Sequence, residues 1–160
     1  SEVMEYLNTL FGFMIPIINE RHGIVNKFLG DGFMAVFGAP VDDGEQCRHA
    51  VAASMEILSG LEKLNSAGRI PRTRIGIGLH LGLAVTGNVG GSDRKEYTVI
   101  GDVVNLASRI EQATKQFGAQ LLVSEAVMAS LGRVEGITPR DMGPVELKGQ
   151  AHPVRVFMLA

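Results

Sequence analysis

An aspartate flanked by glycines is the first feature of the sequence that could take part in catalysis. Asp31, with a glycine on either side, separates two short runs of strand-forming residues, 24–29 and 33–37. A carboxylate at such a hairpin turn is a suitable Mg²⁺ ligand, because Mg²⁺ takes few protein ligands and leaves positions for phosphate oxygens. The same residues also simply make a hairpin, and by themselves they favour that interpretation. Lys27, on the preceding run, is either a functional cation or an edge lysine whose stem lies along apolar surface.

A second candidate is an asparagine and an arginine four residues apart. Asn105 and Arg109 lie in the segment 102–117, whose pattern predicts a helix, so both side chains project from one face. A guanidinium beside an amide suits a phosphate whose negative charge grows in a transition state. Gln112 and Gln116 share that face, which equally fits an ordinary solvated surface.

Other reactive side chains give little support to nucleophilic or zinc chemistry. Cys47 lies on an apolar helical stripe and is expected in the core, and the histidines have no metal-ligand spacing. No phosphate-binding loop of the GxxxxGK[ST] type occurs. His80 is the one histidine on a glycine-rich segment, where a structural role is still the more economical interpretation.

The composition is that of an ordinary globular domain. The sequence has 160 residues, of which 46% are apolar and 20% charged, which favours a single domain. The formal net charge is −2 and no basic block occurs, which argues against nucleic acid as a partner. One cysteine favours a reducing, cytoplasmic location. Apolar runs fall short of the roughly 20 residues of a membrane span, so no membrane contact is expected within this stretch.

The elements that position these residues follow from hydrophobic periodicity. One helix is predicted over 2–21 and contains Pro16. A second helix is predicted over 43–66, with Asp42 or Asp43 as its N-cap. The stripe of the second helix is expected to face the core and comprises Cys47, Val51, Ser54, Leu58 and Leu61. Strands are expected over 95–100 and 121–123, a short helix after Ser124, and weaker strands near 144–148 and 154–159.

The segment 75–85 alternates apolar residues with small ones. This period of two predicts two strands that meet near Gly82. One face of these strands, here called the bald face, carries almost no side chains, so we expect another segment or molecule to pack closely against it. In the helix that follows, the residues expected to face the core are Val103, Ala107, Ile110 and Phe117. The order of elements predicts an α+β fold, with a mixed sheet covered by helices in one domain.

Taken in order, these segments resemble one family, the catalytic domains of class III nucleotidyl cyclases. The resemblance rests on residues 27–38 (KFLGDGFMAVFG) and 97–109 (YTVIGDVVNLASR), with support from residues 78–90 and from 146–149 (ELKG). It covers nearly the whole chain. It implies the nucleotidyl cyclase fold, a ferredoxin-like mixed sheet covered by helices, and conversion of ATP to 3′,5′-cyclic AMP and pyrophosphate with two Mg²⁺ or Mn²⁺ ions.

The resemblance also assigns roles to residues. Asp31 matches a metal-binding aspartate, and Lys27 and Thr98 match the two positions that recognise the purine. Lysine with threonine implies adenine. Asn105 matches the residue that orients the ribose, and Arg109 the one that stabilises charge on the α-phosphate. The lysine that contacts the terminal phosphates is matched by Lys148.

Family members work as head-to-tail dimers, so a homodimer with shared active sites is implied. The glycine-rich face of 75–85 and the Asn105 face would then meet the partner and ATP. The family's other metal aspartate lies on a strand before the first helix. Because this chain begins inside that helix, we expect the first strand to be missing, and little activity unless it is restored. Gln150 stands where many members have a second lysine.

Two other functions stay open at this point. One is a guanylate cyclase, which would differ only in the base pocket. The other is a catalytically inactive cyclase-like module for nucleotide sensing or dimerisation. The presence of Lys27, Asp31, Asn105 and Arg109 together favours an enzyme, because an interaction module does not need all four.

Overall fold

A computed structural model describes residues 1–39, 42–89 and 96–160, and the side chains of all of these except 85–89 and 96–100. The chain divides into two compact units, Ser1–Thr73 and Arg74–Ala160. Each unit is described by itself. The sequence-based expectation of a single domain, and of a missing first strand, stays a prediction.

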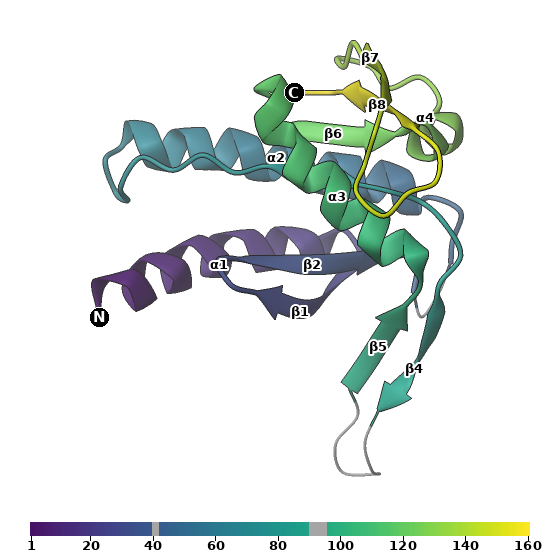
Figure 1. Cartoon of the computed structure of the whole chain (residues 1–160). Helices are drawn as coiled ribbons and strands as arrows, with labels where there is room; N and C mark the ends of the chain where they lie inside the picture. The colour runs from purple at the N-terminus through teal and green to yellow at the C-terminus, as the bar shows by residue number, and fades with distance from the viewer. Residues whose placement is uncertain (40–41, 90–95) are drawn as a thin grey trace. The chain divides into compact units, whose positions relative to one another are not determined.

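The first unit is built from two helices and a hairpin. Its elements are α1 (Glu2–Glu20), β1 (Gly23–Leu29), β2 (Gly32–Phe37) and α2 (Gln46–Ser66), and α1 contacts both β1 and α2 (Figure 1). α1 begins at an N-cap, where the Ser1 hydroxyl accepts a hydrogen bond from the Met4 backbone nitrogen. The apolar stripe predicted for α2 is confirmed, since all five of its residues, Cys47, Val51, Ser54, Leu58 and Leu61, are buried.

The predicted start of α2 was wrong by three residues. Asp42 and Asp43 do not cap the helix; each carboxylate accepts a backbone hydrogen bond two residues ahead, from Gly44 and from Glu45, both at 2.9 Å. Such local bonds stabilise turns in competition with helix formation. The helix therefore begins only at Gln46.

The second unit holds a mixed four-stranded sheet. Its elements are β3 (Ile77–Leu79), β4 (Val85–Val89), β5 (Glu96–Ile100), α3 (Asp102–Phe117), β6 (Leu121–Ser124), α4 (Glu125–Leu131), β7 (Arg140–Val145) and β8 (Val154–Met158). The strand order is β3-β6-β8-β7, with β3 parallel to β6 and the other pairs antiparallel. β4 and β5 form a separate antiparallel pair. The predicted α+β class with a mixed sheet is confirmed, while β7 begins earlier than the predicted strand at 144–148.

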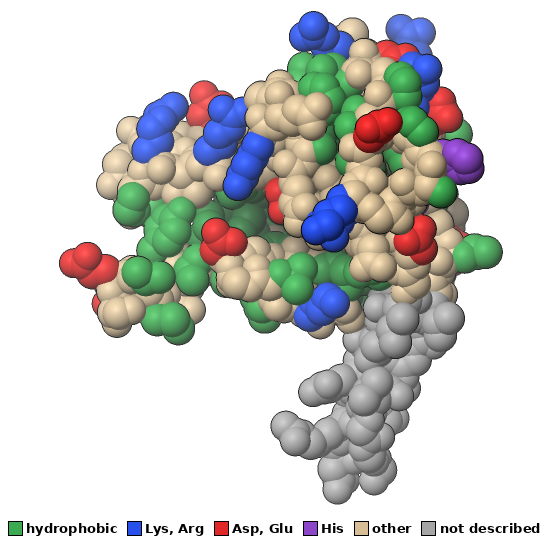
Figure 2. All heavy atoms as spheres, viewed as in Figure 1, with side chains coloured by type: hydrophobic (Ala, Val, Ile, Leu, Met, Phe, Trp, Pro, Cys, Tyr) green, Lys and Arg blue, Asp and Glu red, His purple; other side chains and the backbone are tan. Residues whose placement is uncertain are grey.

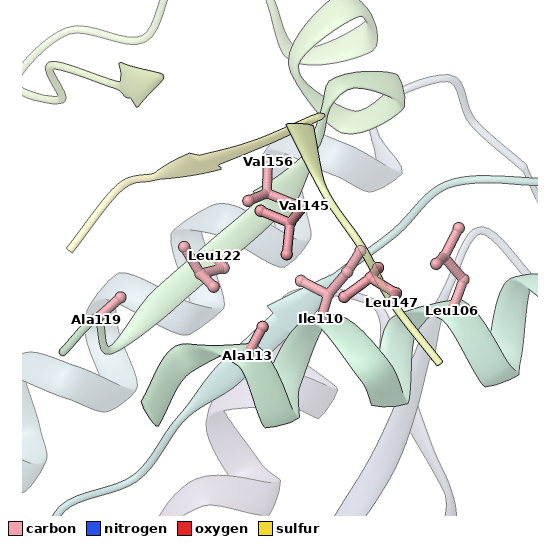
Figure 3. Close-up of a cluster of buried hydrophobic side chains, with 8 residues drawn as sticks. All are labelled: Leu106, Ile110, Ala113, Ala119, Leu122, Val145, Leu147 and Val156. Atoms are coloured by element: carbon pink, nitrogen blue, oxygen red, sulfur yellow. The ribbon is translucent and has the colours of Figure 1, made fainter. Parts of the chain in front are cut away.

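α3 packs against this sheet through a single apolar cluster. Figure 3 shows its side chains Leu106, Ile110 and Ala113 facing Leu122 of β6 and Val156 of β8, and the cluster also includes Ala119, Val145 and Leu147. Burying such side chains stabilises the unit by about 1.5–3 kcal/mol for each large one. The cluster therefore fixes α3, and whatever α3 carries, to the sheet.

Two sequence-based expectations in this unit need correction. The alternating segment 75–85 forms a strand only over Ile77–Leu79 before Val85, and Leu83 is 98% exposed. β3 is short because its pairing with β6 covers only three residues. The buried residues of α3 are Leu106, Ile110, Ala113 and Thr114. Of the residues predicted to face the core, Ile110 is buried and Phe117 packs half-buried against the cluster, whereas Val103 and Ala107 are not part of it, because the sheet meets the helix along the Leu106–Ile110–Ala113 stripe.

No helix in the described part of the chain is long and apolar enough to cross a membrane. The charges on the visible face are mixed: Figure 2 shows acidic and basic side chains interspersed among the coloured residues.

Candidate functional site

Asp31 lies in a two-residue hairpin loop. Leu29 pairs with Gly32, so the loop consists of Gly30 and Asp31 alone. Gly30 has φ +61°, whereas Asp31 has no positive φ, which is the pattern of a type II′ turn with glycine at its first central position. The Asp31 side chain is exposed at the tip of the hairpin. The turn thus presents a carboxylate to any ligand that approaches this end of β1 and β2.

A β-bulge precedes Lys27, and no local pattern in the sequence indicates it. Val25 pairs with Ala35 and Lys27 pairs with Met34, so β1 advances by two residues where β2 advances by one. A bulge reverses the alternation of side chains along a strand and re-aims the residues after it. Lys27 is exposed on β1 after this irregularity.

α3 presents Asn105 and Arg109 away from the apolar cluster. Asn105 is exposed, and Arg109 is half-buried with its Nη1 donating to Gln112 Oε1 at 3.1 Å. The helix ends at Gly118, whose φ of +61° lets the chain turn back toward β6. The guanidinium and the amide, one turn apart, can both contact a single polyanionic ligand.

The bald face of the segment 75–85 is covered by α3 of the same chain. A Cβ placed on Gly78 would collide with the Glu111 backbone nitrogen and lie 2.9 Å from the Ala107 carbonyl oxygen. A Cβ on Gly76 would collide with the Thr114 hydroxyl. The expectation that something lies close to this face is confirmed. The expectation that Gly76 and Gly78 serve a partner or ATP is corrected: they admit the helix that carries Asn105 and Arg109.

Lys148 is the first central residue of a tight turn. The Gln150 backbone nitrogen donates to the Leu147 carbonyl at 3.1 Å, and Gly149 has φ +84°, as a type II turn requires. Leu147 is buried in the α3 cluster, while Lys148 is exposed. The second unit therefore holds Asn105, Arg109 and Lys148 on one helix and on a turn packed against that helix.

Thr98 lies on β5 opposite Gly87, and its side chain falls outside the described part. Lys27 and Asp31 belong to the first unit and the other site residues to the second. Their assembly into one site, whether within a chain or across a dimer, stays a prediction.

His80 has partners that the sequence did not reveal. Its Nδ1 lies 2.8 Å from the Oγ of Ser124, which is buried and also caps α4 by accepting from the Val127 nitrogen. Burial lowers the pKa of His80 below its usual value, and the nearby Asp102 carboxylate partly opposes this. The expected structural role of His80 agrees with these contacts.

A divalent ion at Asp31 would need ligands besides this one carboxylate. Among the residues that the structure describes, no cluster of three or more His, Cys, Asp or Glu side chains could hold a metal ion. Mg²⁺ is commonly bound through one or two carboxylates plus substrate phosphates. The exposed Asp31 carboxylate suits that mode and does not suit a permanent protein cage.

Comparison with known proteins gives a consistent result. The family model "Adenylate and Guanylate cyclase catalytic domain" matches residues 1–160. An adenylate cyclase of Anabaena cylindrica is 36% identical over 98% of this chain, which spans 32% of that relative. Curated relatives are thus much longer; the chain covers 24% of adenylate cyclase 1 of Rhizobium meliloti and 7% of a Dictyostelium discoideum adenylate cyclase.

Solved structures agree in fold. The adenylyl cyclase CyaB of P. aeruginosa superposes with a TM-score of 0.83 at 28% identity, covering 98% of this chain and 81% of that one. The guanylyl cyclase Cya2 superposes with a TM-score of 0.81 at 32% identity, covering 99% and 80%. Relatives named for either nucleotide therefore share this fold.

Proposed function

The chain belongs to the adenylate and guanylate cyclase catalytic domain family, and we propose that it converts ATP to 3′,5′-cyclic AMP. In this reaction the ribose 3′-hydroxyl loses its proton to water and its oxygen forms a bond to the α-phosphorus. The bond from that phosphorus to the oxygen bridging the α- and β-phosphates breaks, and pyrophosphate leaves. One observation carries the proposal: Asn105 and Arg109 lie on α3, and Lys148 lies on the turn that packs against this helix. The predicted nucleotidyl cyclase fold is shared with solved cyclases.

The residues of α3 are suited to the reacting end of the nucleotide. Arg109 stabilises the charge that develops on the α-phosphate oxygens, and Asn105, one turn earlier, orients the ribose. Lys148 supplies a positive charge for the terminal phosphates. All three side chains reach the surface of the second unit, which is what binding of a soluble nucleotide requires.

The hairpin of the first unit completes the proposal. Asp31 holds a divalent ion, Mg²⁺ or Mn²⁺, that arrives with the nucleotide, and two ions are expected at each site. When bound, such ions offset charge on the phosphates and lower the pKa of the attacking hydroxyl. Lys27 and Thr98 contact the purine edge. We propose that two chains form a homodimer with shared sites, and that the enzyme works in the cytoplasm, where ATP is available.

Two alternatives remain as outcomes of the test. A guanylate cyclase is favoured by one observation, the 32% identity to the guanylyl cyclase Cya2. An inactive module for nucleotide sensing would bind ATP without turnover. The adenine proposal rests on Lys27 and Thr98, which match the base-recognising pair of adenylate cyclases by resemblance.

The test is turnover by the full-length protein, because the chain spans a third or less of its curated relatives. ATP and GTP are supplied separately with Mg²⁺ or Mn²⁺, and cyclic AMP and cyclic GMP are quantified. We expect cyclic AMP to predominate and to disappear in Asp31→Asn, which keeps the size of the side chain but removes its charge. Predominant cyclic GMP would transfer the proposal to guanylate cyclase. ATP binding by a folded dimer without product would favour the sensing module.

A further inference from the structure

The turn that carries Lys148 is attached to α3 at both of its ends. At one end Leu147 is buried beside Leu106 and Ile110 of α3, as Figure 3 shows. At the other end the Gln150 side-chain amide donates from Nε2 to Oδ1 of Asp102 at 3.3 Å. Asp102 is the first residue of α3. The two attachments therefore join the turn to the N-terminal half of the helix, the half that carries Asn105 and Arg109.

The two attachments differ in what they control. Leu147 fixes the depth of the turn by burial, but an apolar contact is not directional and allows the turn to pivot. The hydrogen bond of Gln150 is directional, and it acts two residues after Lys148. Together with the backbone bond from Gln150 to Leu147, it fixes the orientation in which the Lys148 stem leaves the turn.

The charges also favour an amide at position 150. Asp102 lies close to the turn and its carboxylate only accepts hydrogen bonds. Among the described residues no ion pair joins Lys148 to a carboxylate. The neutral amide of Gln150 donates to one carboxylate oxygen of Asp102. The Lys148 ammonium is then available to bind an external anion.

We propose that Gln150 is a positioning residue for substrate phosphate: its hydrogen bond to Asp102 holds Lys148 in register with Asn105 and Arg109. This inference rests on the proposed function in assigning Lys148 to the terminal phosphates. It adds that a residue without a role in the chemistry sets the affinity of the site for polyphosphate through the N-terminus of α3.

The test is a double-mutant cycle in the full-length protein. Four forms are compared: wild type, Gln150→Ala, Lys148→Ala and the double variant. For each, kcat and KM for ATP are measured, together with the Kd for inorganic triphosphate by calorimetry. We expect Gln150→Ala to raise KM and Kd by about two- to tenfold, the effect of losing one hydrogen bond, with a smaller change in kcat. In the Lys148→Ala background the same substitution should change neither constant.

Two further variants separate positioning from general stability. Gln150→Met keeps the length and neutrality of the side chain but has no donor, so it should raise KM and Kd as much as Gln150→Ala does. Gln116→Ala removes an exposed glutamine from the last turn of α3 and should change neither KM nor Kd. Melting temperatures are recorded for every form.

The outcomes distinguish this inference from the proposed function. Equal effects of Gln150→Ala in the two backgrounds, or a lowered melting temperature with unchanged KM and Kd, would overturn the positioning role. A wild type that makes no cyclic nucleotide contradicts the proposed function. The double-mutant cycle measured with the Kd for inorganic triphosphate then still tests whether Gln150 positions Lys148. Absence of triphosphate binding by the wild type would overturn both.

Discussion

Replacing Gly78 by alanine tests whether the contact between β3 and α3 positions the candidate site. The added Cβ would collide with the Glu111 nitrogen and lie 2.7 Å from Glu111 Cα and 2.9 Å from the Ala107 carbonyl oxygen. All three are backbone atoms of α3, so no side-chain rotation relieves the overlap. The Cα separation is about 0.7 Å short of an ordinary contact of 3.4 Å. Either α3 or β3 has to move by at least that amount, because the Glu111 nitrogen lies closer still to the added Cβ.

The expected cost follows from what such a shift disturbs. Overpacking usually costs about 1–3 kcal/mol, and we expect about 3 kcal/mol here because the displaced atoms are backbone. The same shift loosens Ile110, which is fully buried between α3 and the sheet. It also moves Asn105 and Arg109, and misplacement of catalytic groups by about 1 Å can lower turnover by about a hundredfold.

The assay is urea denaturation followed by circular dichroism, with Gly82→Ala as the matched control in the same unit. A Cβ on Gly82 would lie 3.2 Å from the Val103 side chain and 3.7 Å from His80 Nε2, and would touch no backbone atom of α3, so that variant should lose less than about 1 kcal/mol. For Gly78→Ala the melting temperature should fall by about 6–12 °C. If the two variants unfold at the same urea concentration, α3 does not lie on Gly78 as described and the reasoning fails.

Three further predictions concern the site and its surroundings. Arg109→Ala should lower kcat by orders of magnitude with little change in ATP affinity, because its contact strengthens in the transition state; equal losses in kcat and affinity would contradict that role. Lys27→Ala and Asp31→Ala, each inactive alone, should regain part of the activity when mixed, and no recovery from mutants that still dimerise would argue against shared sites. Because burial lowers the pKa of His80, the free energy of unfolding should decrease as pH falls below about 6.5, the unfolded value, and His80→Gln should flatten that slope; an unchanged slope would contradict the burial of His80.

Much of the fold could be predicted from the sequence because its signals are local. The stripe from Cys47 to Leu61 predicted the buried face of α2, and Ser124 predicted the N-cap of α4. Errors arose where local signals compete or where pairing decides. Asp42 and Asp43 stabilise turns instead of capping α2. Alternation over 75–85 predicted longer strands than the three-residue pairing of β3 with β6 allows.

The candidate residues themselves were also found from the sequence, because their types, order and spacing match one family. Spacing alone placed Asn105 and Arg109 on one face of a helix and Asp31 in a hairpin turn, and the structure agrees with both placements. The bulge before Lys27 could not be predicted from the sequence, because a bulge depends on the register of β1 with β2.

The sequence by itself determined the family, the element order and which side chains are available for chemistry. Only the tertiary structure decided that Gly78 admits α3, and that Gln150 is joined to Asp102, 48 residues away. Contacts between residues so far apart leave no periodic pattern in the chain. They arise when burial of the α3 cluster brings the helix and the Lys148 turn together, and when β3 packs against the backbone of the same helix.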